Sequence, residues 1–186
     1  ALLSVLRPRD PDEGTAMIAA AAEEGASLEL ISGCTKNALG HKVKATRQLD
    51  LSGLSGITLY EPEELVLRAQ CGTSRASIEQ TLAARGQMLA FEPPDFGALY
   101  GGDSGRDTIG GIVAANLSGP RRIKAGAVRD HILGVAAVNG LGERFKSGGR
   151  VMKNVTGYDL SKLLTGSFGT LAAITEVTLK VLPAPE

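Results

Sequence analysis

The chain has 186 residues and a formal net charge of zero, since Lys plus Arg and Asp plus Glu each number 20. Zero net charge argues against a nucleic-acid-binding protein, because phosphate binding depends on a basic excess. Hydrophobic residues make up 43% and no apolar run approaches the roughly 20 residues that cross a bilayer, so we expect a core-forming cytoplasmic protein without a transmembrane segment.

Glycine is over-represented and aromatic residues are scarce. The chain holds 24 Gly but only 4 Phe, 3 Tyr and no Trp. Because glycine costs backbone entropy, this excess indicates tight turns or a close approach of the backbone to a ligand. The two cysteines, Cys34 and Cys71, lack CxxC spacing, and the two histidines add no cluster. We therefore expect neither a disulfide framework nor a metal site.

The first part of the chain, residues 1–61, is typical of a small βαβ unit. The apolar run 2–6 predicts a strand, and Asp10 followed by Pro11 predicts the start of a helix. This helix is expected to continue to about residue 24, where Gly25 ends it. Further strands are expected at residues 27–32, 48–51 and 57–61.

The second part, residues 62–186, predicts a larger lobe. A strand at 65–69 is followed by a helix at 74–85 with Ser74 as its N-cap. A loop rich in Gly and Pro covers residues 91–107, and a short helix covers 109–115. A strand at 132–138, a hairpin turn at Asn139-Gly140, a returning strand at 143–146, a helix at 159–164 and a long final strand at 171–182 complete the chain. The fold class is α+β, a small βαβ lobe packed on a larger, mostly antiparallel sheet with flanking helices.

The loop at residues 33–40 is the first candidate binding segment. It directly follows a predicted strand, and its small and polar residues leave several backbone N–H groups clustered, an arrangement that suits phosphate. Thr35 and Asn37 could add side-chain donors and Lys36 a cation. An ordinary surface connection is the alternative, because the GxGxxG and GxxxxGK[ST] spacings are both absent.

The segment 108–119 is the second candidate. Thr108 is the expected N-cap of a helix whose first turn contains Gly110 and Gly111. The two glycines would leave helix N–H groups open at the positive end of the helix dipole. The glycines could allow close approach of a ligand or close packing of another helix, and the sequence does not favour one explanation over the other.

A third glycine-rich region covers residues 148–160 and 166–171. Its Lys, Asn, Thr, Gly and Tyr residues show too little apolar patterning for a plain strand or helix. A solvated turn would account for Asp159 as a helix cap but for little else in the region.

At these segments the chain resembles the FAD-binding domain of the PCMH-type flavoprotein superfamily, which includes vanillyl-alcohol oxidase and p-cresol methylhydroxylase. Within it, the chain is similar to the FAD-binding subunits of bacterial glycolate oxidases. The resemblance rests on EPPDFG at 92–97, TIGGIVAANLSGPRR at 108–122, AGAVRDHILG at 125–134 and the run from SGGRVMKNVTGYDL to the final VLP at 147–183.

The resemblance implies that FAD lies extended between the two lobes, with the backbone amides of residues 33–38 on its pyrophosphate. The residues that it places at the cofactor are Gly33, Cys34, Thr35, Lys36, Asn37, Ala38, Leu39, Pro93, Pro94, Asp95, Thr108, Ile109, Gly110, Gly111, Ala114, Asn116, Ser118, Gly119, Gly126 and Ile174. On this basis we expect Val at position 110 or 111 to weaken FAD binding sharply, and Ala at position 36 to matter less.

Two departures from the family pattern bear on the chemistry. Covalent members carry a flavin-linked histidine in the first loop, where this chain has Cys34, so non-covalent FAD is expected and a cysteinyl link is the alternative. Family members also continue into a substrate-binding cap domain, whereas this chain ends at residue 186. No catalytic base can be named here, His131 is expected to be structural, and the isolated chain is expected to be inactive.

Three functions follow from the resemblance. The first is an oxidoreductase component that oxidises an α-hydroxy acid, glycolate to glyoxylate, and passes electrons through FAD to a partner flavin subunit and an iron–sulfur subunit. The second is a non-catalytic flavin-binding or assembly subunit. The third is a fragment of a D-lactate or related 2-hydroxy-acid dehydrogenase. The expected location is the cytoplasm, with attachment to the inner membrane through partner subunits as an alternative.

Overall fold

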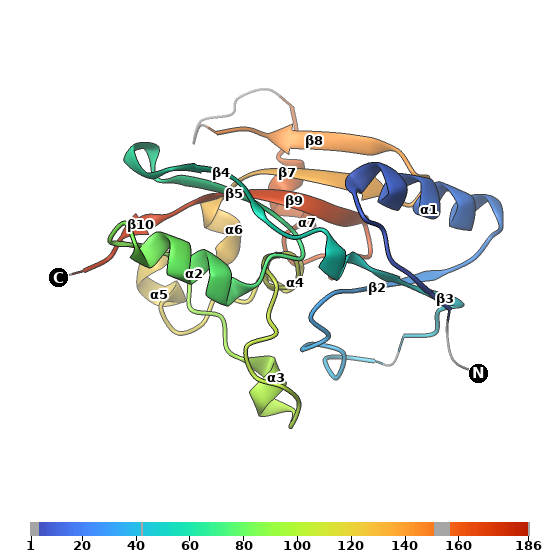
Figure 1. The fold of residues 1–186 in the computed structure, drawn as a ribbon, viewed down its shortest axis with the longest axis horizontal. Helices are drawn as coiled ribbons and strands as arrows, with labels where there is room; N and C mark the ends of the chain where they lie inside the picture. Colours follow the sequence, from blue (N-terminus) through green and yellow to red (C-terminus); the bar gives the residue numbers. More distant parts are fainter. Residues whose placement is uncertain (1–3, 42, 151–156, 186) are drawn as a thin grey trace.

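A five-stranded antiparallel sheet forms the centre of the computed structural model, which describes residues 4–41, 43–150 and 157–185 (Figure 1). The strand order is β4-β5-β9-β7-β8. The strands are β4 (Ile57–Glu61), β5 (Val66–Gln70), β7 (Ile132–Asn139), β8 (Arg144–Gly148) and β9 (Ala172–Lys180). Each overlaps a predicted strand, and β7 and β8 form the predicted hairpin.

Strand β9 separates two hydrophobic cores. Successive side chains of a strand point to opposite faces. Ala172 and Ile174 accordingly belong to the larger core, and Ala173 between them belongs to the smaller one. The pairing with β7 skips Thr175, which is therefore the extra residue of a β-bulge. The bulge reverses the alternation, so that Val177 and Leu179 return to the same core as Ile174.

A second sheet of three parallel strands lies against the smaller core. Its order is β1-β3-β2, and its strands are β1 (Ser4–Leu6), β2 (Leu28–Ile31) and β3 (Arg47–Asp50). Helix α1 (Pro11–Glu23) connects β1 to β2 and begins where the Asp10 carboxylate accepts a hydrogen bond from the Glu13 amide at 2.8 Å. This arrangement confirms the predicted βαβ unit. Ile18 of α1 and Leu49 of β3 fill the smaller core together with Cys71.

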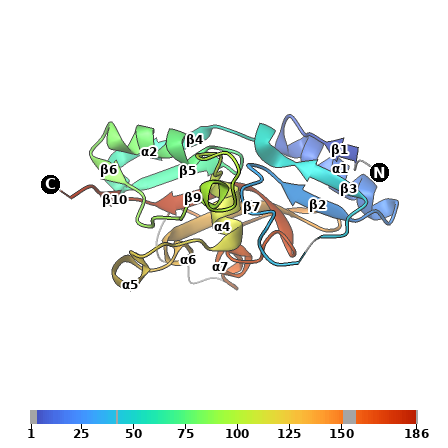
Figure 2. The same cartoon turned by 90° about the horizontal axis from the view of Figure 1, so that it is seen from below.

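Four helices cover the larger core: α2 (Arg75–Ala83), α4 (Ile109–Ala115), α6 (Val128–His131) and α7 (Leu160–Leu164). Seen from below, α4 lies in the middle, with α2 on one side and α6 and α7 on the other (Figure 2). The predicted caps are present, because Ser74 accepts from the Ser77 amide and Asp159 accepts from the Lys162 amide. Helix α4 thus lies at the centre of the helical layer that covers the larger core (Figure 2).

Several short elements differ from the sequence expectation. The predicted loop 91–107 contains helix α3 (Phe96–Leu99), and two further one-turn helices, α5 (Arg122–Ala125) and α6, precede β7. The predicted final strand is divided, since β9 ends at Lys180 and β10 (Leu182–Pro183) pairs with β6 (Gln87–Met88). Two 3₁₀ turns, η1 (Leu51–Gly53) and η2 (Pro62–Glu64), flank β4. One-turn helices and two-residue strands are too short to show a hydrophobic period.

Part of the third glycine-rich region, residues 151–156, lies outside the described residues. Within the described ranges, no helix is both long and apolar enough to cross a membrane.

The two cysteines occupy opposite environments, which gives a direct check of the fold. Cys71 is 2% exposed and burial raises its pKa to about 12, whereas Cys34 is exposed. Because the thiolate is the reactive form, an aromatic disulfide reagent is expected to titrate one thiol in the native chain and two in denaturant. The Cys34→Ser variant should give none in the native state. Two thiols reacting at equal rates in the native chain would contradict the described core.

Candidate functional site

A groove of about 510 Å³ lies between the loop after β2, the start of α4 and the turn before β9. A smaller hollow of about 100 Å³ adjoins it and shares Ser32, Gly111, Ala114 and Phe168 with it. The groove is within the volume range of small-molecule sites. The predicted residues that line one hollow or the other are Gly33, Cys34, Thr35, Lys36, Asn37, Leu39, Thr108, Gly110, Gly111, Ala114 and Ile174.

A third hollow, of about 250 Å³, lies between α1, β2 and the start of β9. It is lined by none of the predicted residues. We therefore take the larger groove as the candidate site.

The loop at residues 33–39 lines the groove with every residue except Ala38. Its conformation depends on Gly33, because a Cβ there would lie 1.9 Å from the carbonyl oxygen of Arg106. Cys34 follows with a left-handed backbone at φ 57°. In the described part of the chain, the backbone N–H groups of residues 34–38 have no hydrogen-bond acceptor, while the Leu39 amide donates to the Lys36 carbonyl at 2.9 Å. A run of neighbouring free amides is a site for an anion.

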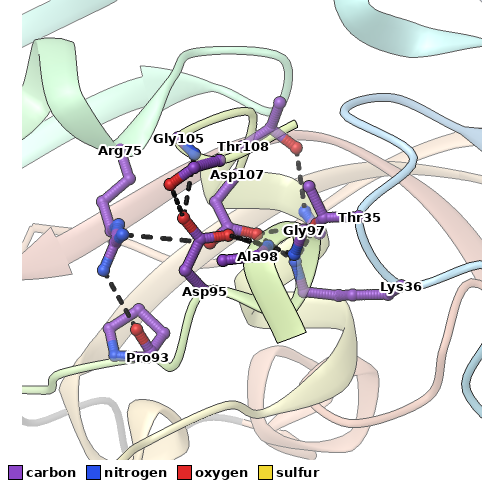
Figure 3. A network of polar contacts seen from close by, with 12 residues as sticks. Thr35, Lys36, Arg75, Pro93, Asp95, Gly97, Ala98, Gly105, Asp107 and Thr108 are labelled. Carbon is purple, nitrogen blue, oxygen red and sulfur yellow. Dashed lines mark hydrogen bonds and ion pairs between the residues drawn. The ribbon is translucent and has the colours of Figure 1, made fainter. Parts of the chain in front are cut away.

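A buried carboxylate holds this loop in place. Asp107 is fully buried, and its Oδ1 accepts hydrogen bonds from the Thr35 hydroxyl at 2.7 Å and from Lys36 Nζ at 2.6 Å (Figure 3). The Arg75 guanidinium lies 4.0 Å from the other carboxylate oxygen. The charge of Lys36 is therefore matched by Asp107. The sequence signalled neither this pair nor Arg75, because the partners are 71 residues apart.

The start of α4 differs from the sequence expectation. Its first amides are not open to a ligand, because the Ile109 amide donates to the Thr73 carbonyl at 2.9 Å and the Gly110 amide donates to the Cys71 carbonyl at 2.8 Å. A Cβ on Gly110 would lie 2.6 Å from Cys71 Cβ. Gly110 is thus required for the packing of α4 against the end of β5.

Gly111 has different surroundings. A Cβ there would lie 3.3 Å from Thr108 Oγ1 and 3.8 Å from Lys36 Nζ. Thr108 Oγ1 itself accepts a hydrogen bond from the Gly111 amide at 3.4 Å, as expected of an N-cap. Gly111 lines both hollows, so its missing side chain leaves space in the groove.

The remaining predicted residues lie outside the two hollows, and they are Ala38, Pro93, Pro94, Asp95, Ile109, Asn116, Ser118, Gly119 and Gly126. Ile109 is completely buried in the larger core. The Pro93 carbonyl accepts a hydrogen bond from Arg75 at 3.0 Å.

The Asp95 carboxylate caps its own loop. It accepts hydrogen bonds from the Ser104 hydroxyl and from the backbone amides of Gly105, Gly97 and Ala98. These hydrogen bonds, with that from Ser104 the strongest, lower the pKa of Asp95 to about 2. Asp95 is therefore ionised at neutral pH and is satisfied within residues 95–105.

The residues after α4 form a structural corner. Asn116 ends the helix with φ 52°, and its side-chain oxygen accepts a hydrogen bond from the Arg129 amide at 3.2 Å. The Ser118 hydroxyl accepts from the Val128 amide at 3.0 Å. Gly119 has φ 69°, and a Cβ there would lie 1.7 Å from the Glu92 carbonyl oxygen. These contacts hold residues 116–119, which follow α4, against the start of α6.

His131 belongs to the same corner. Its Nε2 lies 2.7 Å from the Ala125 carbonyl oxygen, and the residue is 7% exposed. The other ring nitrogen, Nδ1, is buried without a hydrogen-bond partner among the described residues, so only one of the two ring nitrogens is satisfied.

Sequence reasoning missed two residues that face the groove. Ser32 lines both hollows, and its hydroxyl oxygen is buried without a hydrogen-bond partner in the described chain. Phe168 also lines both hollows and is 60% exposed. Ser32 ends a predicted strand and Phe168 lies in the third glycine-rich region, but neither residue type in that position points to a ligand by itself.

The groove has the features of an anion- or nucleotide-binding site. It combines a run of free backbone amides, an unsatisfied serine hydroxyl and a wall of small residues on α4. In the described ranges, no group of three or more His, Cys, Asp or Glu residues could hold a metal ion.

Comparison with known families gives the same class. Residues 3–148 match a family described as FAD binding domain, and the chain belongs to this family. An alkyldihydroxyacetonephosphate synthase shares the fold, with a TM-score of 0.77 at 22% identity over 98% of this chain and 32% of that chain.

The curated relatives include glycolate oxidase subunits from two bacteria and a D-lactate dehydrogenase. Glycolate oxidase subunit GlcE of Escherichia coli (strain K12) is 44% identical over 84% of this chain and 43% of its own length. Glycolate oxidase subunit GlcD of Bacillus subtilis (strain 168) is 30% identical over 98% of this chain and 37% of its own length. A D-lactate dehydrogenase of Anaerostipes hadrus is 35% identical over 87% of this chain and 31% of its own length. The chain thus spans less than half the length of these relatives.

The Asp107–Lys36 pair gives a prediction about stability. The Lys36→Met variant leaves a buried carboxylate without its close cation, and it is expected to lose about 3 kcal/mol of unfolding free energy. The double variant Lys36→Met/Asp107→Leu should recover most of that loss, since both charges are then removed. Urea unfolding measures both.

The matched control is Lys162→Met, which removes an exposed ion pair with Asp159. It should cost below about 1 kcal/mol. Equal losses in Lys36→Met and Lys162→Met would show that the buried pair does not hold the loop.

Proposed function

We propose that this chain holds FAD in the groove as the flavin-binding part of an oxidoreductase that converts an α-hydroxy acid, glycolate in the first instance, to the corresponding oxo acid. The observation that carries the proposal is the run of free amides at residues 34–38 beside the groove, in a chain that belongs to the FAD-binding family. The glycolate oxidase subunit of Escherichia coli, at 44% identity, supports the choice of substrate.

Each part of the groove has a proposed task. The amides of residues 34–38 would bind the pyrophosphate, and the Asp107–Lys36 pair would keep their loop in position. Lys36 has three N–H donors, of which the structure assigns two, so the third is available to a phosphate oxygen. Bound FAD supplies the redox chemistry, while the protein supplies position and electrostatics. The predicted residues outside the hollows would hold the loops that flank the groove.

We propose that the cofactor is bound without a covalent link. Cys34 lines the groove, and its thiol donates a weak hydrogen bond to the Ser32 carbonyl at 3.4 Å. A bond between Cys34 Sγ and the flavin is the alternative, and it is tested by the acid precipitation below.

The proposed partners and location rest on the family resemblance, with the glycolate oxidase relatives as support. We propose a partner flavin subunit and an iron–sulfur subunit that receive the electrons, in the cytoplasm or at the inner membrane through those partners.

A second candidate function is D-lactate oxidation, which the Anaerostipes hadrus relative favours. Anaerobic addition of glycolate or D-lactate to the FAD-loaded assembly distinguishes the two, because the true substrate bleaches the flavin absorption. A non-catalytic flavin-binding subunit would bind FAD and bleach with neither acid.

The first test is a visible absorption spectrum of the chain after incubation with FAD and removal of the excess. We expect a two-banded flavin spectrum that moves to the supernatant on acid precipitation. Colour that stays with the pellet would identify Cys34 as a covalent link. A colourless chain would contradict the proposed function.

Neighbouring glycines of α4 give a matched pair of variants. Gly111→Ala places a methyl group in the groove and improves helix propensity, so we expect weaker FAD binding with unchanged or higher stability. Gly110→Ala drives a methyl group into Cys71 and should cost about 1–3 kcal/mol of stability. Calorimetric FAD titration and thermal unfolding separate the two effects. Unchanged FAD affinity in Gly111→Ala would count against this groove.

A further inference from the structure

Phe168 has a backbone conformation that a bulky residue rarely adopts. It lies in the turn 167–170, which the Thr170 amide closes by donating to the Ser167 carbonyl at 3.0 Å. The two central residues, Phe168 and Gly169, have φ of 53° and 73°. This is the pattern of a type I′ turn, which favours Asn-Gly because both central residues need positive φ. Phenylalanine at the first central position is therefore strained.

The surrounding structure enforces this conformation. The Phe168 amide donates to the Ala114 carbonyl at 2.8 Å, and the Gly166 amide donates to the Val113 carbonyl at 3.1 Å. Both bonds tie the turn to the end of α4. On the other side, a Cβ on Gly169 would lie 2.9 Å from Leu30 Cδ1, so the turn also fits closely against β2. A strained residue persists only where its neighbours over-determine it.

The ring of Phe168 is not used for packing. The side chain is 60% exposed and belongs to neither hydrophobic core. Among the described residues it has no aromatic partner. It lines both hollows, at the point where they adjoin, together with Gly111 and Ala114 of α4. The turn thus holds an exposed aromatic residue at the border of the two hollows, where its side chain adds nothing to either hydrophobic core.

A second strained residue lines the same groove. The non-glycine residues with positive φ in the described chain are Cys34, Leu65, Asn116 and Phe168. Asn116 tolerates this conformation well. Of the other three, Cys34 and Phe168 both line the groove. Strained backbone clusters at ligand sites in proteins. The two strained residues therefore indicate a role in ligand binding at the groove, not a role in stabilising the fold.

We propose that Phe168 stacks its ring on a planar ring of the bound dinucleotide, and that its left-handed backbone serves this contact. The inference rests on the proposed function, since it takes FAD as the ligand. The planar ring is the adenine or the isoalloxazine, which share the flat aromatic face that a phenylalanine ring contacts. An aromatic stack on a base contributes enough that its removal lowers affinity about ten- to a hundredfold.

The test compares FAD affinity with the stability of the FAD-free chain in three variants. Phe168→Gly and Phe168→Asn remove the ring and accept positive φ readily, whereas Phe168→Tyr keeps the ring. We expect the Phe168→Gly and Phe168→Asn variants to bind FAD about ten- to a hundredfold more weakly in calorimetric titration. The melting temperature of the FAD-free chain should not fall in either variant. Phe168→Tyr should bind FAD like the parent. Leu171→Ala, a half-exposed apolar residue outside the groove, is the control and should also bind like the parent.

Titration with ADP identifies the ring. A parallel loss of ADP affinity assigns the stack to the adenine, and an unchanged ADP affinity beside a lowered FAD affinity assigns it to the isoalloxazine. Parent-like FAD affinity in the Gly and Asn variants overturns the inference while the proposed function stands. A melting temperature that falls together with the affinity also overturns it, because Phe168 would then support the fold. A parent chain that binds no FAD overturns both.

Discussion

The buried carboxylate of Asp107 is the interaction on which the groove depends. It receives the Thr35 hydroxyl and the Lys36 ammonium from one wall, and the next residue, Thr108, caps the helix that forms the other wall. A buried charge without a partner is strongly unfavourable. The loop is therefore held relative to α4 before any ligand binds. Such preorganisation lowers the cost of binding.

The position of α4 depends in turn on the two cores. Gly110 lets the helix approach Cys71, and Cys71 belongs to the smaller core while Ile109 belongs to the larger one. The bulge at Thr175 keeps the apolar residues on both sides of it in the larger core. The walls of the groove come from β2, the loop after it, α4 and the turn before β9. The adjoining smaller hollow reaches Cys71 of the smaller core and Ile174 of the larger one. A dinucleotide placed there would contact both lobes, as the family resemblance implies.

Local sequence signals predicted most of the elements. Asp10 and Ser74 are N-caps because their side chains bond to amides three residues later, and that pattern is readable along the chain. The candidate loop at residues 33–39 was identifiable from its small and polar residues after a strand. The one-turn helices α3, α5 and α6 were not, because four residues show no hydrophobic period. The role of the glycine pair in α4 was only half predicted, since Gly110 serves packing and Gly111 borders the groove.

The sequence by itself determined the α+β class, the βαβ unit, the caps and the FAD-binding family, because these depend on neighbouring residues and on motifs. Only the tertiary structure decided that Asp107 pairs with Lys36, that the Cys71 carbonyl accepts a hydrogen bond from the Gly110 amide, and that Phe168 lines the groove. These contacts join residues that are distant in the chain. Their partners are selected by how the strands, the bulge and α4 pack, and a linear pattern carries no record of that packing.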